Sequence, residues 1–447
     1  MNLKKLSKTL RPGLLGRRMF FRHAASALTG YFLLPGRPGE TIAQGAVNPI
    51  NTAKNVIFIL LTGAPSHTDT FDLKEGPWLP SFVAPTRYNG MLFPQGLMPT
   101  LAENIQDLAM VRSLRAHATA HGLAQQWAQI GRNPIQGLNR IAPHIGAVVA
   151  YELASTKVDQ PVPPFVSLNA AAGPGASFLP PTTEPMYINP NGGGLGNTRH
   201  ADGQAAFARR LDLTWKLDTE MTYSQPLGGT LDDVDQFRSK ASLMMYNSTI
   251  DSIFAFDQNT RNSYGNSNFG NACLVARNLF RANVGARFVQ ISFGSWDHHG
   301  NIYAQNNNLQ LMTRQLDAGL GALIKDLKAD GSFDSTLIVT MGEFGRTTGA
   351  LNAGAGRDHH AQQAAMLAGA GIRGGRAIGS TNEQGTFVDD TGWAADRTIW
   401  AEDIEATIYS ALGIDWTKVI HGPALGRGFE YVPTGEAYEY LPIRELW

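Results

Sequence analysis

The chain has 447 residues, of which 43% are hydrophobic and 17% charged, a composition that suits one large α/β domain or two smaller ones. Its 37 basic and 37 acidic residues leave a formal net charge of zero, so nothing indicates binding to nucleic acid or to an anionic membrane surface. The single Cys273 excludes an intramolecular disulfide and a cysteine-based zinc site. We expect Cys273 to be a small buried apolar residue.

The first 46 residues have the features of an export signal. A basic start leads to the pair Arg17 and Arg18, a modestly apolar stretch follows at 24–34, and small residues at Ala43 and Gly45 suit a signal peptidase. The twin arginines before x-Phe-Phe resemble a twin-arginine (Tat) signal, which predicts a periplasmic or extracellular protein. An amphipathic basic helix or an uncleaved anchor is the alternative. No transmembrane segment is expected after signal removal, because the apolar stretches are too short.

Three apolar, β-branched runs predict strands buried on both faces. They are Asn55–Leu61, Ala286–Ser292 and Thr336–Met341. An amphipathic helix at Leu309–Leu327 connects the second to the third, so these form a βαβ unit with parallel strands. Ligand-binding groups in such sheets follow the carboxyl ends of strands. Residues after both strands, including Asp297 and Glu343, should therefore lie at one edge of the sheet.

The rest of the chain, 47–447, is predicted to form one domain with a helical insertion or cap around 188–285. A helix is expected within Met98–Leu114, with a short strand at its end, and a glycine-rich turn at Gly369–Gly379. Further strands are expected at Phe165–Leu168 and Ala364–Ala368, and a helix at Asp403–Leu412 that ends at Gly413.

Two clusters of carboxylates and imidazoles follow the predicted strands. The first contains Asp297, His298 and His299, and the second contains Asp358, His359 and His360 after a glycine-rich loop. Carboxylate oxygens and imidazole nitrogens are ligands for divalent metal ions, so the pair of clusters predicts a metal site. The alternative is an Asx turn with surface histidines.

Two other places carry residues able to bind a metal. His67, Asp69 and Asp72 follow the first strand, although such residues also cap helices and turns. His117 and His121 are four residues apart, a spacing that puts both on one face of a helix. They are equally well explained as surface residues of a loop.

Several stretches together resemble the bacterial family called domain of unknown function 1501, which belongs to the alkaline phosphatase and sulfatase-like superfamily. Besides the Tat-like leader, the stretches are Val56–Asp72, Met98–Leu114, Trp296–Asn301, Gly342–Thr347, Gly356–His359 and Thr407–Asp415. The resemblance implies an alkaline-phosphatase-like three-layer α/β sandwich: a mostly parallel sheet between helices, with metals at its carboxyl edge. It also implies a hydrolase whose Ser, Thr or formylglycine nucleophile is held by one or two divalent ions.

The sequence departs from that superfamily at three places. Thr62 and Gly63 stand where the first strand normally ends in a metal-binding Asp, and Phe344 stands where a His is usual. Sulfatases carry their nucleophile about ten residues before a Thr-Gly pair. Counting back from Gly131 leads to His121, which is neither an alcohol nor a thiol, and Thr119 is the nearest hydroxyl.

We therefore predict an exported, metal-dependent hydrolase-like protein acting on an anionic substrate, a sulfate or phosphate ester of a small molecule or polysaccharide. The expected ligands of a zinc, manganese or calcium ion are Asp297, His299, Glu343, Asp358 and His359. Arg346 would offer a fork of donors to an anionic substrate oxygen. His121 or His360 would act as general base or as a histidine nucleophile. The alternatives are a non-catalytic envelope binding protein, favoured by the missing nucleophile, and a purely structural protein.

Overall fold

The computed structural model describes residues 47–134, 142–154, 160–170, 172–224, 230–305, 308–421, 428–434 and 438–447. The predicted signal at 1–46 lies outside them. The chain divides into two compact units. The described part of one is a short sheet of β15 (Val419–His421) and β16 (Gly428–Glu430), whose last residue belongs to the other unit. The second unit, Gly45–Lys418 with Glu430–Trp447, contains everything that follows. Within the described ranges, no helix is long and apolar enough to cross a membrane.

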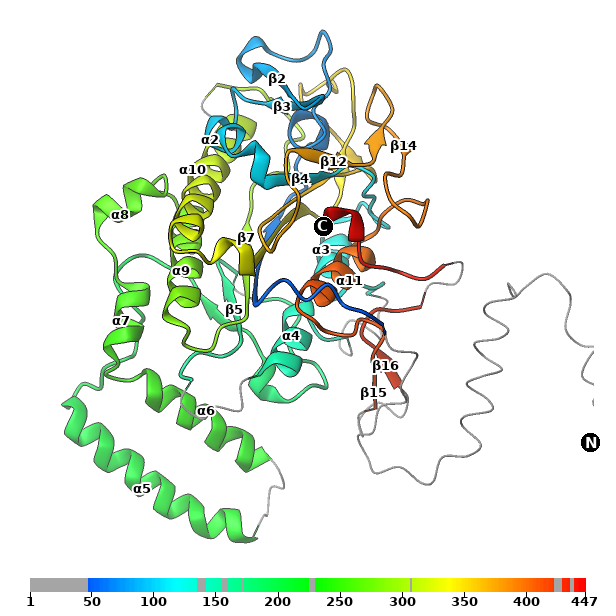
Figure 1. Ribbon diagram of the computed structural model, residues 1–447. Coiled ribbons are helices and arrows are strands. Elements are labelled where there is room, and N and C mark those ends of the chain that lie inside the picture. Colours follow the sequence, from blue (N-terminus) through cyan, green and yellow to red (C-terminus); the bar gives the residue numbers. More distant parts are fainter. Residues whose placement is uncertain are drawn as a thin grey trace, which may run out of the picture. The chain divides into compact units, whose positions relative to one another are not determined.

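An eight-stranded sheet forms the middle of the second unit (Figure 1). Seven strands run in one direction, and β11 alone is antiparallel to its two neighbours. The order is β12 (Arg376–Ile378), β4 (Leu108–Val111), β11 (Ala365–Ala368), β8 (Thr336–Gly342), β1 (Asn55–Leu61), β7 (Phe288–Phe293), β5 (Phe165–Leu168) and β6 (Met186–Ile188).

The three central strands end level with one another. Leu61 at the end of β1 is in register with Phe293 of β7 and with Gly342 of β8. The loops that carry Asp297 and Glu343 therefore leave the same edge of the sheet, as predicted. The two strands of the βαβ unit are parallel but not adjacent, because β1 lies between them.

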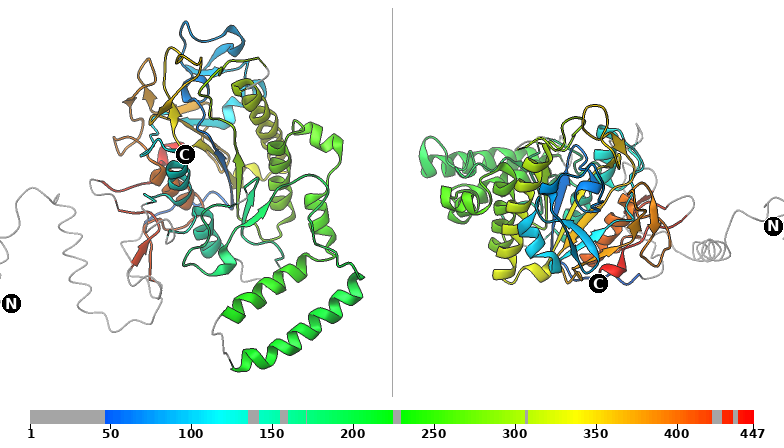
Figure 2. Two further views of the ribbon diagram at one scale, coloured as in Figure 1. Left: turned by 180° about the vertical axis from the view of Figure 1, so that it is seen from behind. Right: turned by 90° about the horizontal axis from the view of Figure 1, so that it is seen from above.

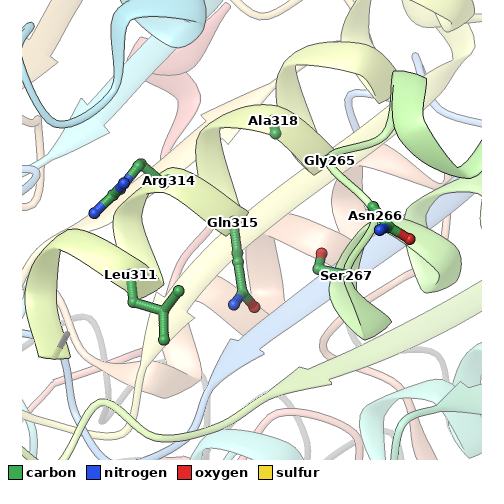
Figure 3. A pocket seen from close by; sticks show the side chains of 7 residues that line it. All are labelled: Gly265, Asn266, Ser267, Leu311, Arg314, Gln315 and Ala318. Atoms are coloured by element: carbon green, nitrogen blue, oxygen red, sulfur yellow. The ribbon is translucent and has the colours of Figure 1, made fainter. Parts of the chain in front are cut away.

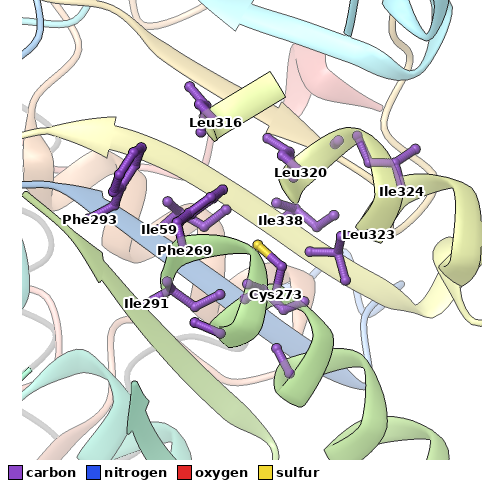
Figure 4. Close-up of a cluster of buried hydrophobic side chains, with 14 of the residues drawn as sticks. Ile59, Phe269, Cys273, Ile291, Phe293, Leu316, Leu320, Leu323, Ile324 and Ile338 are labelled. Atoms are coloured by element: carbon purple, nitrogen blue, oxygen red, sulfur yellow. The ribbon is translucent and has the colours of Figure 1, made fainter. Parts of the chain in front are cut away.

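Helices cover both faces of the sheet (Figures 1 and 2). On one face, α9 (Asn268–Ala282) and α10 (Asn308–Ala329) pack against Ile59, Ile291 and Ile338 (Figure 4). Cys273 is completely buried in this core, and burial raises the pKa of its thiol, as expected of an inert residue. On the other face lie α4 (Ile145–Leu153), whose N-cap His144 contacts Phe165, and α11 (Ala401–Ala411). This three-layer arrangement confirms the predicted fold class.

Helices make up most of the described residues after 202 in the segment 188–285, for which the sequence predicts a helical insertion or cap. This segment contains α5 (Gly203–Ser224), α6 (Thr230–Met244), α7 (Ser248–Phe254), α8 (Gln258–Ser263) and α9. The last of these covers the sheet and so belongs to the central fold. Two short hairpins complete the unit: β2 (Pro85–Tyr88) with β3 (Met91–Pro94), and β13 (Ser380–Thr381) with β14 (Val388–Asp390).

Two predicted elements differ from the structure. The helix expected within Met98–Leu114 is only α2 (Pro99–Glu103), because a tight 3-10 turn at Ile105–Asp107 follows and leads into β4. The segment Gly369–Gly379, predicted as a turn, contains the edge strand β12. The edge strand pairs with β4, a long-range contact that its glycine-rich sequence does not indicate.

Candidate metal centre

Four side chains from three separate parts of the chain converge at the carboxyl edge of the sheet. They are His121, Asp297, His299 and His359, and one ligand atom from each lies within 4.8 Å of the others. We call this set the histidine–aspartate cluster. His121 is the first residue of α3 (His121–Ile130). Asp297 and His299 lie in the loop after β7. His359 begins β10 (His359–His360), which pairs antiparallel with β9 (Gly345–Arg346).

Four of the six distances between the ligand atoms of the cluster are close to the edge of a metal coordination tetrahedron. The Oδ1 atom of Asp297 lies 3.4 Å from Nε2 of His121, 3.1 Å from Nε2 of His299 and 3.8 Å from Nε2 of His359. The Nε2 atoms of His299 and His359 are 3.0 Å apart. Bonds of about 2.0–2.1 Å from a zinc ion would put tetrahedral ligands about 3.3 Å apart.

The other ring nitrogen of each histidine is held by an acceptor outside the cluster. Nδ1 of His121 lies 2.6 Å from Oε1 of Glu343, and Nδ1 of His299 lies 3.1 Å from Oδ1 of Asp358. Nδ1 of His359 lies 2.7 Å from the carbonyl oxygen of Thr119. A carbonyl or carboxylate oxygen accepts, so we assign the proton of each neutral ring to Nδ1. The three Nε2 lone pairs then point to a shared centre, the tautomer that metal-bound histidines adopt.

This arrangement is unsatisfied without a cation. Although Nε2 of His299 also accepts from Arg346 at 3.3 Å, the lone pairs of His299 and His359 lie 3.0 Å apart and repel unless a proton or a metal lies between them. Nε2 of His121 is buried and has no hydrogen-bond partner among the described residues. The residues present therefore fit a divalent metal ion.

The carboxylates that hold the rings have opposite surroundings. Glu343 is buried, and its Oε1 also accepts from the backbone N–H of Gly63 (3.1 Å) and from Nε2 of Gln125 (3.2 Å). Burial raises the pKa of Glu343, and the hydrogen bonds from His121, Gln125 and Gly63 counter this only in part. Asp358 is exposed, and the hydrogen bond from His299 lowers its pKa. These two residues, predicted as ligands, lie one step further out and hold the imidazole rings of His121 and His299.

Arg346 lies beside the cluster and is almost completely buried. Partial burial raises the pKa of Asp297, but the hydrogen bond and the charge of Arg346 outweigh this, so the pKa lies below its usual value. The guanidinium has five acceptors, all within the protein: Ala64 O at 2.9 Å, Arg357 O at 3.2 Å, His299 Nε2 at 3.3 Å, and Gly63 O and Asp297 Oδ1 both at 2.5 Å.

Glycines allow the loops of the site to approach closely. Gly63 has a φ of +99°, and a Cβ there would lie 2.7 Å from the backbone nitrogen of Asp297. At Gly356, a Cβ would lie 2.1 Å from the carbonyl carbon of His299. The turn after β1 and the loop before His359 can thus reach the Asp297 loop only without side chains at these positions.

The remaining predicted site residues lie outside the cluster. His360 is half-buried, stacks on His67 and contacts none of the four. His298 is buried beside Trp296. His117 precedes α3, so it does not share a helical face with His121; it lies between two tryptophans, with its Nε2 3.1 Å from Oε2 of Glu402.

The corner after β1 is closed by ion pairs of its own. Asp69 pairs with Arg357, with both side chains fully buried, and accepts a hydrogen bond from Tyr303. Asp72 lies 3.4 Å from Nε of Arg112. Among the contacts of the described residues, neither Asp69 nor Asp72 interacts with the histidine–aspartate cluster.

Sequence reasoning missed Gln125 and Asn352, which hold Glu343 and Asp358. Neither stands next to a motif residue, so no local signal identifies them. A hollow of about 520 Å³ lies elsewhere, between the turn before α9 and the outer face of α10 (Figure 3). The cluster itself is open to solvent, with the side chains of Asp297 and His299 45% and 46% exposed.

Fold and site together define a three-layer α/β protein with a histidine–aspartate cluster at the carboxyl edge of its sheet. The chain belongs to the family described as "Protein of unknown function (DUF1501)", whose model matches residues 53–439. Among curated proteins, none matches the sequence.

Several solved structures match the chain at low identity. Ps i-CgsB in complex with k-i-k-neocarrahexaose is 13% identical, and the match covers 81% of this chain and 72% of that one with a TM-score of 0.41. The PsFucS1 sulfatase from Pseudoalteromonas sp. is 10% identical, and the match covers 96% of this chain and 75% of the sulfatase with a TM-score of 0.38. A protein in the alkaline phosphatase superfamily from Vibrio parahaemolyticus is 12% identical, and the match covers 86% of this chain and 72% of that protein with a TM-score of 0.35. At these scores the likenesses carry no argument about activity.

Proposed function

We propose that this protein is an exported, metal-dependent hydrolase of the alkaline phosphatase and sulfatase-like superfamily that acts on sulfate or phosphate esters. The observation that carries the proposal is the convergence of three Nε2 atoms on the carboxylate of Asp297, with every Nδ1 held by an outer acceptor. A structural histidine needs no such shared centre.

The ligand set favours one class of metal. Three imidazole nitrogens and one carboxylate oxygen suit zinc, and they also accept manganese. Calcium takes six to eight oxygen ligands, which this cluster does not supply. Of the three ions that the sequence left open, we therefore propose zinc first.

Two groups of residues would have different roles at the metal ion: one binds the ion, and the other orients the histidine rings. His121, Asp297, His299 and His359 would bind the ion, while Glu343 and Asp358 fix two of the rings. A bound divalent ion would polarise the ester oxygen and lower the pKa of a coordinated water. Because Asp297 and His299 are nearly half exposed, an ester group has access to the centre from solvent. His121 then serves as a ligand in place of the predicted base or nucleophile.

The substrate class rests on the sequence resemblance and on the chemistry of the site. Sulfate and phosphate esters carry anionic oxygens, which a divalent cation at an exposed site attracts. The Tat-like leader supports export to the periplasm or beyond, since that route carries proteins that have already folded and taken up a metal.

The alternative is a non-catalytic relative that uses the fold for binding in the cell envelope. One observation favours it: among the described residues, no serine, threonine or cysteine side chain is hydrogen-bonded to any member of the histidine–aspartate cluster. A hydrolase with this cluster would therefore use water as its nucleophile.

Metal content tests the proposal directly. The purified protein, measured by inductively coupled plasma mass spectrometry, should contain zinc or manganese that is lost in Asp297→Ala. The matched control is His360→Ala, a neighbouring histidine outside the cluster, which should keep its metal. The wild type should then hydrolyse p-nitrophenyl sulfate or p-nitrophenyl phosphate only with metal bound. A folded wild type that takes up no ion would overturn the proposal. A metal-loaded protein without esterase activity would favour the binding protein.

A further inference from the structure

We propose that Arg346 is a resident cation of the histidine–aspartate cluster, which limits the centre to one divalent metal ion and holds two of its ligands in place. The inference rests on the proposed function, because it concerns the metal that this function requires. It gives Arg346 a positioning role, in place of the substrate-binding fork predicted from the sequence.

The hydrogen bonds of Arg346 leave no fork of donors for a substrate: the protein occupies all five before a metal binds, and a metal on His299 would release only the Nη1–H group that faces it. A guanidinium has five N–H groups, and five acceptors of the protein surround this one. Three are backbone carbonyls, from Gly63, Ala64 and Arg357, which fix the plane of the group beside the turn after β1. The side chain is 1% exposed, so solvent or substrate reaches it only by breaking these bonds.

The other two acceptors are members of the cluster. Nη2 of Arg346 donates to Oδ1 of Asp297, and Nη1 lies 3.3 Å from Nε2 of His299. A carboxylate oxygen has lone pairs for both an arginine and a metal, but an imidazole nitrogen has only one. Asp297 can therefore bridge the guanidinium and a metal ion. Nε2 of His299 can accept the hydrogen bond from Arg346 only while no metal is bound to it. Arg346 would therefore hold the side chains of Asp297 and His299 in place before the metal binds.

The charges of the site balance for a single ion. Asp297, Glu343 and Asp358 contribute three negative charges, and Arg346 contributes one positive charge, so the formal charge is −2 with neutral histidines. One divalent ion neutralises the centre. A second would have to lie next to both the first ion and the guanidinium, without a carboxylate to offset it, and repulsion between like charges at such distances is strong in a partly buried site.

The number of ions per chain tests the inference. The full chain is stripped with EDTA and titrated with Zn²⁺ by isothermal calorimetry, and the bound metal is counted by mass spectrometry after gel filtration. We expect one ion per chain in the wild type. In Arg346→Gln the site keeps three carboxylates and loses its cation, so the bound zinc should rise towards two ions per chain.

Arg357→Lys is the matched control. Arg357 is as deeply buried as Arg346, but its side chain pairs with Asp69 and not with the cluster. This variant should still bind one ion. Circular dichroism establishes which variants fold, and the wild-type count needs no variant at all.

Each outcome separates the inference from the function on which it rests. Two ions per wild-type chain would overturn the role of Arg346 and leave the metal-dependent hydrolase standing. A folded Arg346→Gln protein that still binds one ion would do the same. No ion in the wild type would overturn both.

Discussion

Two corners of this protein have similar sequences and opposite structures. After β1 come His67, Asp69 and Asp72; after β7 come Asp297 and His299. The first set is buried and paired, with Asp69 on Arg357 and Asp72 beside Arg112. The second set is exposed and shares a centre with His121 and His359. The difference lies in what the rest of the chain brings to each corner: arginines that pair with the carboxylates at the first, and two further histidines together with Arg346 at the second.

Ligand-capable residues at a strand end can form a metal site where partners inside the protein do not satisfy all of their lone pairs. Arg357 satisfies both oxygens of Asp69 from inside the protein, so that carboxylate has nothing left to offer. In the histidine–aspartate cluster the partners are placed behind the rings, and the Nε2 atoms remain directed at one another. Substitutions should therefore affect stability at the first corner and metal binding at the second.

The largest expected effect is the loss of stability in Asp69→Asn. The substitution leaves Arg357 charged and unpaired in a fully buried position, which costs about 3–5 kcal/mol. Urea denaturation measured in EDTA should show this loss. Asp358→Asn, which removes an exposed carboxylate, should cost far less stability under the same conditions. Equal losses in the two variants would contradict the distinction between the corners.

A smaller effect is expected from the pH dependence of His67. Burial lowers the pKa of His67 to about 4, and the nearby Asp72 counters this only in part. Between pH 6.5 and 4 the unfolded chain binds a proton that the folded protein does not bind, so stability falls as the pH falls. The slope is about 1.4 kcal/mol per pH unit, or about 3 kcal/mol over the range.

His67→Gln isolates this contribution. Glutamine can still donate to the carbonyl of Gly385, which His67 Nε2 contacts at 2.8 Å, but it does not titrate. Free energies of unfolding measured in EDTA between pH 7.5 and 4.5 should fall less steeply in the variant than in the wild type. Parallel curves for the two proteins would show that His67 does not titrate in this way.

The smallest expected effect concerns the outer carboxylate of the metal centre. In Asp358→Asn, Nδ1 of His299 loses its charged acceptor, and metal affinity should fall by about 10–100-fold while the fold is retained. A competition assay with a fluorescent zinc chelator measures this change. His360→Ala, adjacent in sequence to a proposed ligand, should leave the affinity unchanged. If Asp358→Asn abolished binding completely, Asp358 would be a ligand itself, as the sequence predicted.

The sequence predicted most of the sheet because its central strands are simple in pattern. The apolar run at Asn55–Leu61 coincides with β1, and those at Ala286–Ser292 and Thr336–Met341 match β7 and β8 within a residue or two. Strands buried on both faces exclude polar residues throughout, which makes them visible without any alignment. The edge strand β12 was missed, since an edge strand needs only partial burial and its pairing depends on β4.

The site was predicted less completely, for a geometric reason. Asp297 and Glu343 were placed at one edge from the right-handed parallel crossover alone. The separate roles of Asp297 and Glu343 were not predicted, because the local sequence does not distinguish a carboxylate that binds a metal from one that orients a histidine. His121 was recognised as functional, yet its place among the ligands depends on where α3 begins relative to β8.

By itself, the sequence determined an α/β class with parallel strands and the edge of the sheet at which chemistry is expected. These follow from hydrophobic period and strand direction, which are local properties or rules of connection. The family followed from its motifs, and the three-layer arrangement was expected from the resemblance to that family. Only the tertiary structure decided which polar residues are satisfied by internal partners and which keep a lone pair free. That outcome depends on contacts between segments more than 200 residues apart, such as His121 with Glu343 and Asp69 with Arg357, and no local pattern records them.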